Sequence, residues 1–165
     1  MKVKISFLAA IALAICFITS CRTNHEVSGA VSAMTVETVS LGDRGDGSIV
    51  LRAWGSGANM GDAIEQAKRN ALHDVLFTGI KRGSRNDRVK RPLIPDVNAE
   101  EKYSIYFDPF FSLGGEYKNF VVEEPGSAKR MKSTGLSRDG YGVVVIVDYA
   151  KLKQQLLNDG ILTNY

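Results

Sequence analysis

The order of apolar and polar positions divides the chain into an apolar leader, a polar stretch and a longer segment in which strand and helix periods follow one another. Polar and apolar residues alternate over 35–41 with β-branched side chains enriched, and residues 48–54 have a strand-like pattern again. Between them, the sequence GDRGDG at 42–47 supplies the glycines and aspartates typical of a turn. The pattern therefore predicts a β-hairpin.

The strongest helical period covers residues 60–78. Its apolar stripe consists of Met60, Ile64, Ala67, Ala71 and Val75. We expect an amphipathic helix that is capped by Asn59 and ends at Gly79 or Gly83. Because the alanines of the stripe are small, the helix axis is expected to come close to a sheet, with His73 on the solvent side.

Two shorter helices are predicted further along the chain. Residues 98–107 have acidic side chains in their first turn, with Asn98 as the expected N-cap and Asp108-Pro109 as the expected stop. A closing helix is predicted from about 149 to 158, with Asp148 as its cap.

Three more strands are predicted at about 116–124, 129–137 and 141–148, separated by tight turns. The run 143–147 is apolar throughout, which indicates a central strand covered on both faces. The element order is therefore β-β-α-(α)-β-β-β-α. It predicts a single α+β domain, with a largely antiparallel sheet of about five strands packed by two or three helices.

The leader has the layout of a removable bacterial secretory signal. Lys2 and Lys4 precede an apolar stretch at 5–18, which is shorter than the roughly 18 to 20 residues of a membrane-spanning helix. The sequence FITSC at 17–21 resembles the bacterial lipobox, in which small residues precede a cysteine that becomes acylated. We therefore expect cleavage before Cys21 and covalent lipid on that residue. Several acyl chains would hold the protein almost permanently on a membrane.

Removal of residues 1–20 changes the character of the chain. Cys16 leaves with the signal and Cys21 is consumed by lipid, so no thiol remains for a disulfide. The mature chain keeps 19 basic and 18 acidic residues, a balance that gives no argument for nucleic acid. Residues 21–34 are expected to form a lipidated flexible tether and residues 35–165 the folded domain. Arg22, which is not acidic, suggests sorting to the outer membrane, facing the periplasm.

Two segments carry a resemblance to known proteins. Residues 49–57, IVLRAWGSG, followed by residues 63–71, AIEQAKRNA, look like a pattern of small envelope lipoproteins in which a strand and a glycine turn lead into an alanine-rich helix. The chain is similar to uncharacterised lipoproteins of Bacteroidetes, and more distantly to the N-terminal domain of the flagellar assembly protein FlgT. The resemblance implies an α+β domain that acts as an accessory or assembly part of the cell envelope, with no catalytic residues to transfer.

The stretch at 81–91 contains six cations and one acid. The cations are Lys81, Arg82, Arg85, Arg88, Lys90 and Arg91. We expect a solvated loop that is a candidate site for anionic lipid headgroups, lipopolysaccharide or an acidic partner. The alternative is a charge run with no binding role.

Other patterns give little support for catalysis or cofactors. The glycines at 55, 57 and 61 stand between a strand and a helix, but a lone glycine motif is weak evidence for a phosphate site, so no cofactor is expected beyond the lipid on Cys21. His25 and His73 are the only histidines, and neither has a ligand partner at metal spacing, so no metal is expected.

The sequence therefore favours a non-catalytic accessory lipoprotein that binds another envelope protein or glycan. One alternative is an envelope hydrolase that uses His73 with a carboxylate from residues 116–124. Another is a small-ligand binder with an apolar pocket lined by Trp54, Tyr106 and Phe110.

Overall fold

The computed structural model describes residues 37–83, 90–131 and 140–163, which belong to one compact unit spanning Thr35–Tyr165. The predicted signal, Cys21 and the predicted tether lie outside the described residues. Of the described helices, none has both the length and the apolar character needed to cross a membrane.

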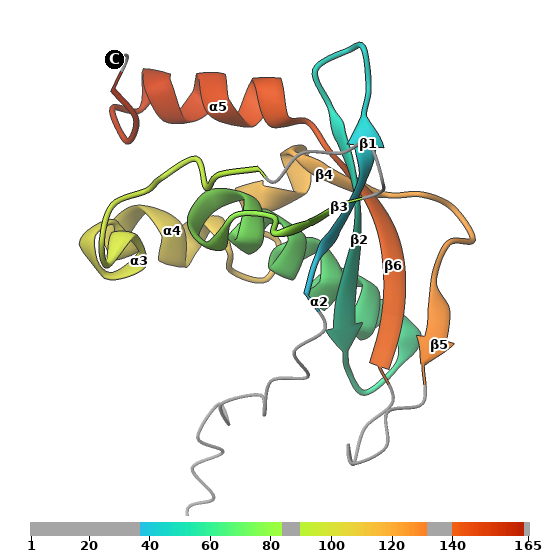
Figure 1. The fold of residues 1–165 in the computed structure, drawn as a ribbon. Helices are drawn as coiled ribbons and strands as arrows, with labels where there is room; N and C mark the ends of the chain where they lie inside the picture. The colour runs from blue at the N-terminus through green and yellow to red at the C-terminus, as the bar shows by residue number, and fades with distance from the viewer. Residues whose placement is uncertain (1–36, 84–89, 132–139, 164–165) are drawn as a thin grey trace, which may run out of the picture. The chain divides into compact units, whose positions relative to one another are not determined.

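The described residues form a six-stranded sheet whose order is β3-β1-β2-β6-β4, with β5 also paired to β6 (Figure 1). The strands are β1 (Val39–Asp43), β2 (Ile49–Ser56), β3 (Arg82–Gly83), β4 (Val121–Glu123), β5 (Lys129–Met131) and β6 (Gly140–Val147). The predicted hairpin is β1–β2, and β6 pairs with the whole length of β2. All pairings are antiparallel except that of β3 with β1.

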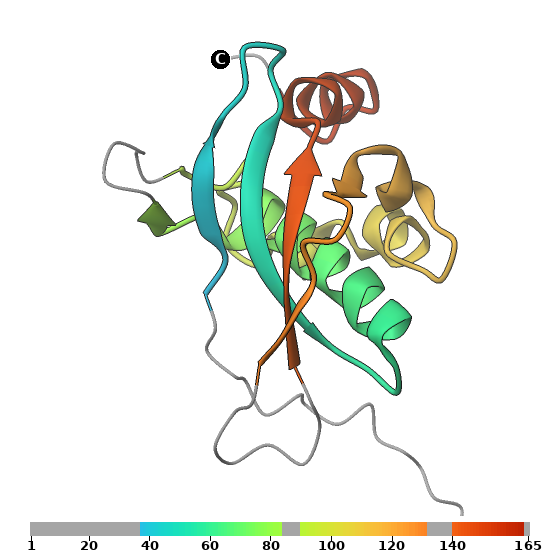
Figure 2. The same cartoon turned by 90° about the vertical axis from the view of Figure 1, so that its right-hand side faces the viewer.

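The helices lie on one side of this sheet (Figures 1 and 2). They are α2 (Met60–His73), a π-helical turn (Asp74–Thr78), α3 (Ala99–Lys102), α4 (Ser104–Phe110), a 3-10 turn (Glu116–Asn119) and α5 (Tyr149–Asn158). The predicted α+β class with a largely antiparallel sheet is thus confirmed. Asn59 caps α2 through a 3.0 Å bond from the Asp62 amide, and Gly79, at a φ of 78°, follows the π-turn.

Several local predictions are wrong. The strand predicted at 116–124 begins as a 3-10 turn and is extended only from Val121. Asn98 has a φ of 57° and makes no side-chain cap. Pro109 lies inside α4 and does not stop it, although the helix ends one residue later, at Phe110. The two-residue strand β3 was not predicted, because its short parallel pairing with β1 leaves no period in the sequence.

The strand β2 and the helix α2 are in close backbone contact. A Cβ atom placed on Gly55 would overlap the backbone oxygen of Ala63 and lie 2.6 Å from the backbone nitrogen of Ala67. Ala63 and Ala67 are themselves fully buried. Small residues on both elements therefore allow the helix backbone to rest on the strand, as the alanine pattern predicts.

The buried face of α2 differs from the predicted stripe in two places. Met60 is 45% exposed and Ile64 is only partly buried, whereas Leu72 and Leu76 are fully buried. Because Ala63 rather than Ile64 faces Gly55, the helix is rotated towards its smaller residues.

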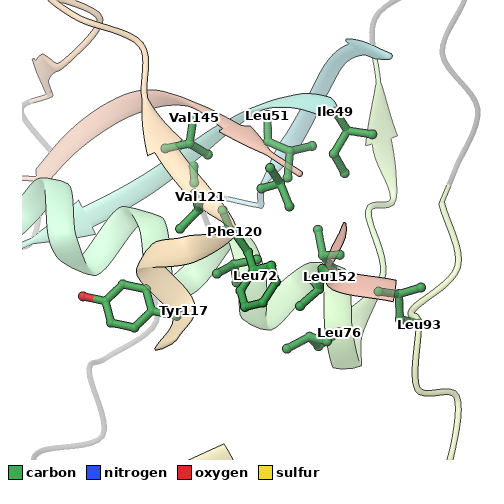
Figure 3. Close-up of a cluster of buried hydrophobic side chains, with 14 of the residues drawn as sticks. Ile49, Leu51, Leu72, Leu76, Leu93, Tyr117, Phe120, Val121, Val145 and Leu152 are labelled. Atoms are coloured by element: carbon green, nitrogen blue, oxygen red, sulfur yellow. The ribbon is translucent and has the colours of Figure 1, made fainter. Parts of the chain in front are cut away.

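The core lies between the inner face of the sheet and these helices (Figure 3). Leu51 and Val145 project from neighbouring strands towards Leu72 and Leu152 of the helical layer, and all four are fully buried. On the other face of β6, Val144 and Ile146 are only partly buried, so the prediction that this strand is covered on both faces is wrong.

A charged network joins α2 to the 3-10 turn at the edge of the core. The Tyr117 hydroxyl donates to Oε2 of Glu65 over 2.6 Å, and the Lys68 ammonium donates to Oε1 over 2.7 Å. Burial raises the pKa of Glu65, but these two hydrogen bonds and the nearby lysine charges outweigh it and lower the pKa to about 2. Glu65 is therefore ionised and paired at neutral pH.

We expect Gly55→Ala to destabilise the domain by about 1–3 kcal/mol, because the added methyl group pushes the α2 backbone away from β2. Urea unfolding followed by circular dichroism measures the change. Gly45→Ala is the matched control, since a Cβ there meets nothing within 4 Å. Equal stability of the two variants would contradict the close-packing argument.

Candidate functional site

The turn between β1 and β2 is held by short local hydrogen bonds. The Arg44 amide donates to the Ser48 carbonyl over 2.8 Å, and the Ser48 amide and hydroxyl both donate to Oδ1 of Asp46, at 2.9 and 2.6 Å. The bonds from Ser48 lower the pKa of the exposed Asp46 carboxyl. The glycines and aspartates of the turn thus fix the backbone from which Arg44 projects.

The end of the basic stretch is fixed to the core by its backbone. Ile80 and Lys90 exchange two amide–carbonyl bonds of 2.9 and 3.0 Å. Beyond them, the amide of Leu93 donates to the carbonyl of Val75 over 3.0 Å, at the π-turn that continues α2. Lys90 and its neighbour Arg91 therefore stand on an ordered segment, and the prediction of a wholly solvated loop is wrong at this end.

The N-terminal part of α5 lies beside the β1–β2 turn (Figure 2), and the Ala150 amide donates to the Gly47 carbonyl over 3.2 Å. Asp148 caps the helix by accepting a 3.0 Å bond from the Lys151 amide, as predicted. The helical period places Tyr149, Lys153 and Leu157 along one face, and all three line the same pocket.

These three segments surround a pocket of about 620 Å³. Its charged lining residues are Arg44, Lys90, Arg91 and Lys153, with Asp43 as the one acid among them. Its apolar lining residues are Ile49, Pro92, Leu93, Leu157 and Leu162. Ile49 and Leu93 belong to the core and lie on the same side of the cluster (Figure 3), so the pocket that they line borders the core there. Four cations therefore converge on a partly apolar hollow.

The pocket's cations differ in how they are partnered. The ammonium of Lys90 lies 2.6 Å from Oδ1 of Asp43, and its side chain is 20% exposed. Arg91 and Lys153 are exposed, and neither forms an ion pair with a carboxylate of the described residues. Burial raises the pKa of the Tyr149 hydroxyl; the charge of Lys90 acts against this shift and that of Asp43 reinforces it. Asp43 thus pairs with Lys90, whereas an anion can approach Arg91 and Lys153 without displacing a carboxylate of the described residues.

Of the six cations predicted as an anionic-partner site, Lys90 and Arg91 line the pocket. Lys81 is exposed and does not line the pocket. The backbone of Arg82, in β3, pairs with that of Val39 in β1. Arg85 and Arg88 lie outside the described residues. Of the four described members of the predicted set, the structure therefore places Lys90 and Arg91 at this pocket.

Arg44 and Lys153 were not predicted as site residues. The four-residue spacing of Tyr149, Lys153 and Leu157 was a usable sequence signal, since it defines a helix face distinct from that of the buried Leu152 and Leu156. Arg44 gave no comparable signal, because a charge in a turn becomes a site residue only through what folds against the turn.

The prediction that His73 lies on the solvent side is met only in part, because its side chain is 43% exposed and is packed against neighbouring rings. Its ring lies edge-on to Phe77 at 5.3 Å and next to Phe111 at 6.5 Å. Nε2 forms an ion pair with Glu100 of α3, and Nδ1 lies 3.9 Å from Asp74. The carboxylate of Asp74, and then that of Glu100, raise the pKa of His73 against the opposing effect of burial.

The carboxylate partners of His73 are thus Asp74 and Glu100, and not the residues at 116–124 that the hydrolase alternative requires. The nearest hydroxyl in this hydrogen-bond chain, that of Thr38, donates to Oδ2 of Asp74 over 2.5 Å and not to the imidazole. The arrangement joins a histidine to carboxylates but gives it no described nucleophile to activate.

The apolar pocket predicted from Trp54, Tyr106 and Phe110 is not assembled. Tyr106 and Phe110 stack at 6.2 Å in the helical layer, where the Tyr106 hydroxyl also donates to Asp159 over 2.6 Å. Trp54 lies over Gly142, on the face of β2 that points away from Ala53 and the core. The sheet therefore separates Trp54 from the other two rings.

The glycine motif has a packing role. Side chains on Gly55 or Gly57 would collide with the first turn of α2, so these glycines allow the strand and the helix to meet. Within residues 37–83, 90–131 and 140–163, no group of three or more His, Cys, Asp or Glu side chains is placed to hold a metal ion.

Comparison of the chain with protein-family models, with curated proteins and with solved structures finds no match. The site is therefore interpreted from its own geometry and charge.

We expect the unfolding free energy to fall as the pH rises above about 6.5, the ordinary histidine pKa. Because folding raises the pKa of His73, its stabilising contribution is complete below that pH and is lost as the pH passes the raised value. Urea midpoints between about pH 6 and pH 9 measure the slope. His73→Gln is expected to flatten it; a slope that persists in this variant would assign the effect to other groups.

Proposed function

We propose that this protein is a lipid-anchored, non-catalytic accessory protein of the bacterial cell envelope, and that it binds an anionic envelope component at the pocket lined by Arg44, Lys90, Arg91 and Lys153. The observation that carries the proposal is the convergence of these four cations, from three separate segments, on one pocket with a single acid. The partner is an acidic protein or an anionic glycan or lipid of the envelope.

The charge arrangement supports binding more strongly than the number of cations does. Exposed lysines and arginines scattered over a surface are ordinary, and the mature chain as a whole has an almost balanced charge. In the pocket, by contrast, Arg91 and Lys153 come from different segments and line the same hollow. Neither has an acidic partner among the described residues. Like charges brought together in this way repel one another, and an anionic ligand relieves that repulsion.

The proposed cellular location of the protein is inferred from its leader sequence. The short apolar stretch, the small residues at 19–20 and Cys21 together favour cleavage and acylation by the lipoprotein route. A tether at 21–34 would leave the domain within reach of the same membrane. We propose the outer membrane, facing the periplasm, because the residue after Cys21 is Arg22 and not an acid.

We expect Cys21→Ala to abolish incorporation of an alkyne-tagged palmitate and to release the protein from firm membrane association, because the acyl acceptor is gone. Cys16→Ala is the matched control and is expected to label like the wild type, since Cys16 lies within the signal. Tagged cells are fractionated and the protein is detected by gel fluorescence. Lipid label or unchanged membrane retention in Cys21→Ala would contradict the proposed anchor.

We expect the double variant Arg91→Gln, Lys153→Gln to lose most crosslinks to a partner captured at the pocket rim. A photoreactive benzoyl-phenylalanine at Thr163, a lining residue, captures the partner in native membranes without relying on lysine chemistry. Arg52→Gln, Lys129→Gln is the matched control, because it removes the same charge from exposed positions of β2 and β5 outside the pocket.

The binding is expected to weaken as salt is raised above about 0.1 M, where the screening length falls to about 10 Å. Crosslinks that survive the pocket variant, or that disappear equally in the control variant, would contradict binding at this pocket. Circular dichroism of each variant confirms that the fold is retained.

A further inference from the structure

We propose that the ligand of the basic pocket is an anionic amphiphile, with its charged head at Arg91 and Lys153 and its hydrocarbon along Ile49, Leu93, Leu157 and Leu162. This inference rests on the function proposed above and specifies the ligand. It follows from the apolar residues that line the pocket together with the cations.

The pocket has an apolar wall that continues into the core. Ile49 and Leu93 are only 4% and 9% exposed, and both belong to the main hydrophobic cluster. Leu157 and Leu162 are partly buried and extend this wall towards the surface. Leu157 and Leu162 therefore carry most of the apolar surface that remains in contact with water. A ligand that carried only charge would leave it there, whereas a hydrocarbon segment would cover it.

On the α5 side of the pocket, a cation and two leucines follow one another in the order that an amphiphile requires. Lys153 and Leu157 are four residues apart on α5, which corresponds to an axial rise of about 6 Å. Leu162 is held over the end of this helix by a 3.0 Å bond from its amide to the Leu156 carbonyl. The cation thus stands one helical turn from Leu157 on the same face of α5, and Leu162 follows beyond the end of the helix.

The ion pair of Lys90 with Asp43 gives the pocket a further property. The Asp43 side chain is 57% exposed, so it can turn towards solvent when another anion approaches Lys90. Asp43 therefore competes with the ligand head, and a head with two negative charges displaces it more readily than a head with one. Removal of the Asp43 charge is expected to strengthen binding.

The size of the pocket agrees with a small ligand. Its volume of about 620 Å³ lies within the range of roughly 300–1,000 Å³ typical of small-molecule sites. The shared chemistry is a phosphate or carboxylate head on an aliphatic chain. A phosphorylated lipid and a fatty acid both have it, and the experiment separates them.

The test uses membranes from cells that make the full-length protein. They are exposed to a dodecyl phosphate probe that carries a diazirine and an alkyne, and the labelled peptides are identified by mass spectrometry. We expect labelling of the pocket segments around 90–93 and 153–163. Unlabelled dodecyl phosphate or dodecanoate is expected to compete, and whichever competes at the lower concentration identifies the preferred head. Inorganic phosphate and dodecanol are expected to compete at least about tenfold less well, because each lacks one half of the ligand.

Variants then separate the two halves of the pocket. Arg91→Gln, Lys153→Gln and, separately, Leu162→Ser are each expected to reduce labelling about tenfold, whereas Asp43→Asn increases it. Ile161→Ser is the matched control, because Ile161 is also partly buried but does not line the pocket. Thermal unfolding of each variant shows whether the fold is intact.

Two results would overturn the inference. One is competition by inorganic phosphate as strong as that by dodecyl phosphate, together with wild-type labelling of Leu162→Ser. The other is labelling confined to peptides outside the pocket. In either case, charge-dependent capture at Thr163 would still support the proposed anionic partner. Loss of both signals would refute the proposed function as well.

Discussion

The contact of Gly55 with the first turns of α2 is the constraint on which the rest of the structure depends. With no side chain between them, the backbone of β2 and that of α2 lie against each other, and Ala63 and Ala67 are fully buried. This contact fixes the position of α2 on the sheet. The π-turn that follows α2 then accepts a hydrogen bond from the backbone of Leu93. The contact at Gly55 therefore also influences where one wall of the pocket lies.

The pocket is held in place by backbone contacts and by one ion pair. The Ile80–Lys90 bridge and the bond from Leu93 to Val75 fix the segment at 90–93 to the end of α2, and the bond from Ala150 to Gly47 joins α5 to the β1–β2 turn. The ion pair of Lys90 with Asp43 links that segment to the turn, and neither Arg91 nor Lys153 takes part in these contacts. Arg91 and Lys153 therefore contribute little to the fold. Cations that have no carboxylate partner within 37–83, 90–131 and 140–163, and that line a pocket with apolar residues, are explained better by a ligand than by stability.

Other charged groups have clear structural roles. Glu65 is paired with Lys68 and Tyr117 and joins α2 to the 3-10 turn, and its pKa of about 2 reflects how strongly its ionised form is stabilised. His73 and Glu100 join the end of α2 to α3 in a similar way. These pairs satisfy one another, whereas Arg91 and Lys153 have no carboxylate partner among the described residues. Their common position at one pocket distinguishes them from other exposed cations.

The sequence by itself determined the α+β class, the β1–β2 hairpin, the close approach of α2 and the caps at Asn59 and Asp148, because each follows from short-range periodicity, turn residues or side-chain size. It also indicated Lys90 and Arg91 as candidate binding residues, from charge density alone. Only the tertiary structure decided that Arg44 and Lys153 join them, that Trp54 is separated from Tyr106, and that His73 pairs with Glu100. These relations join residues from separate segments of the chain, and local patterns carry no information about which segments the fold brings together.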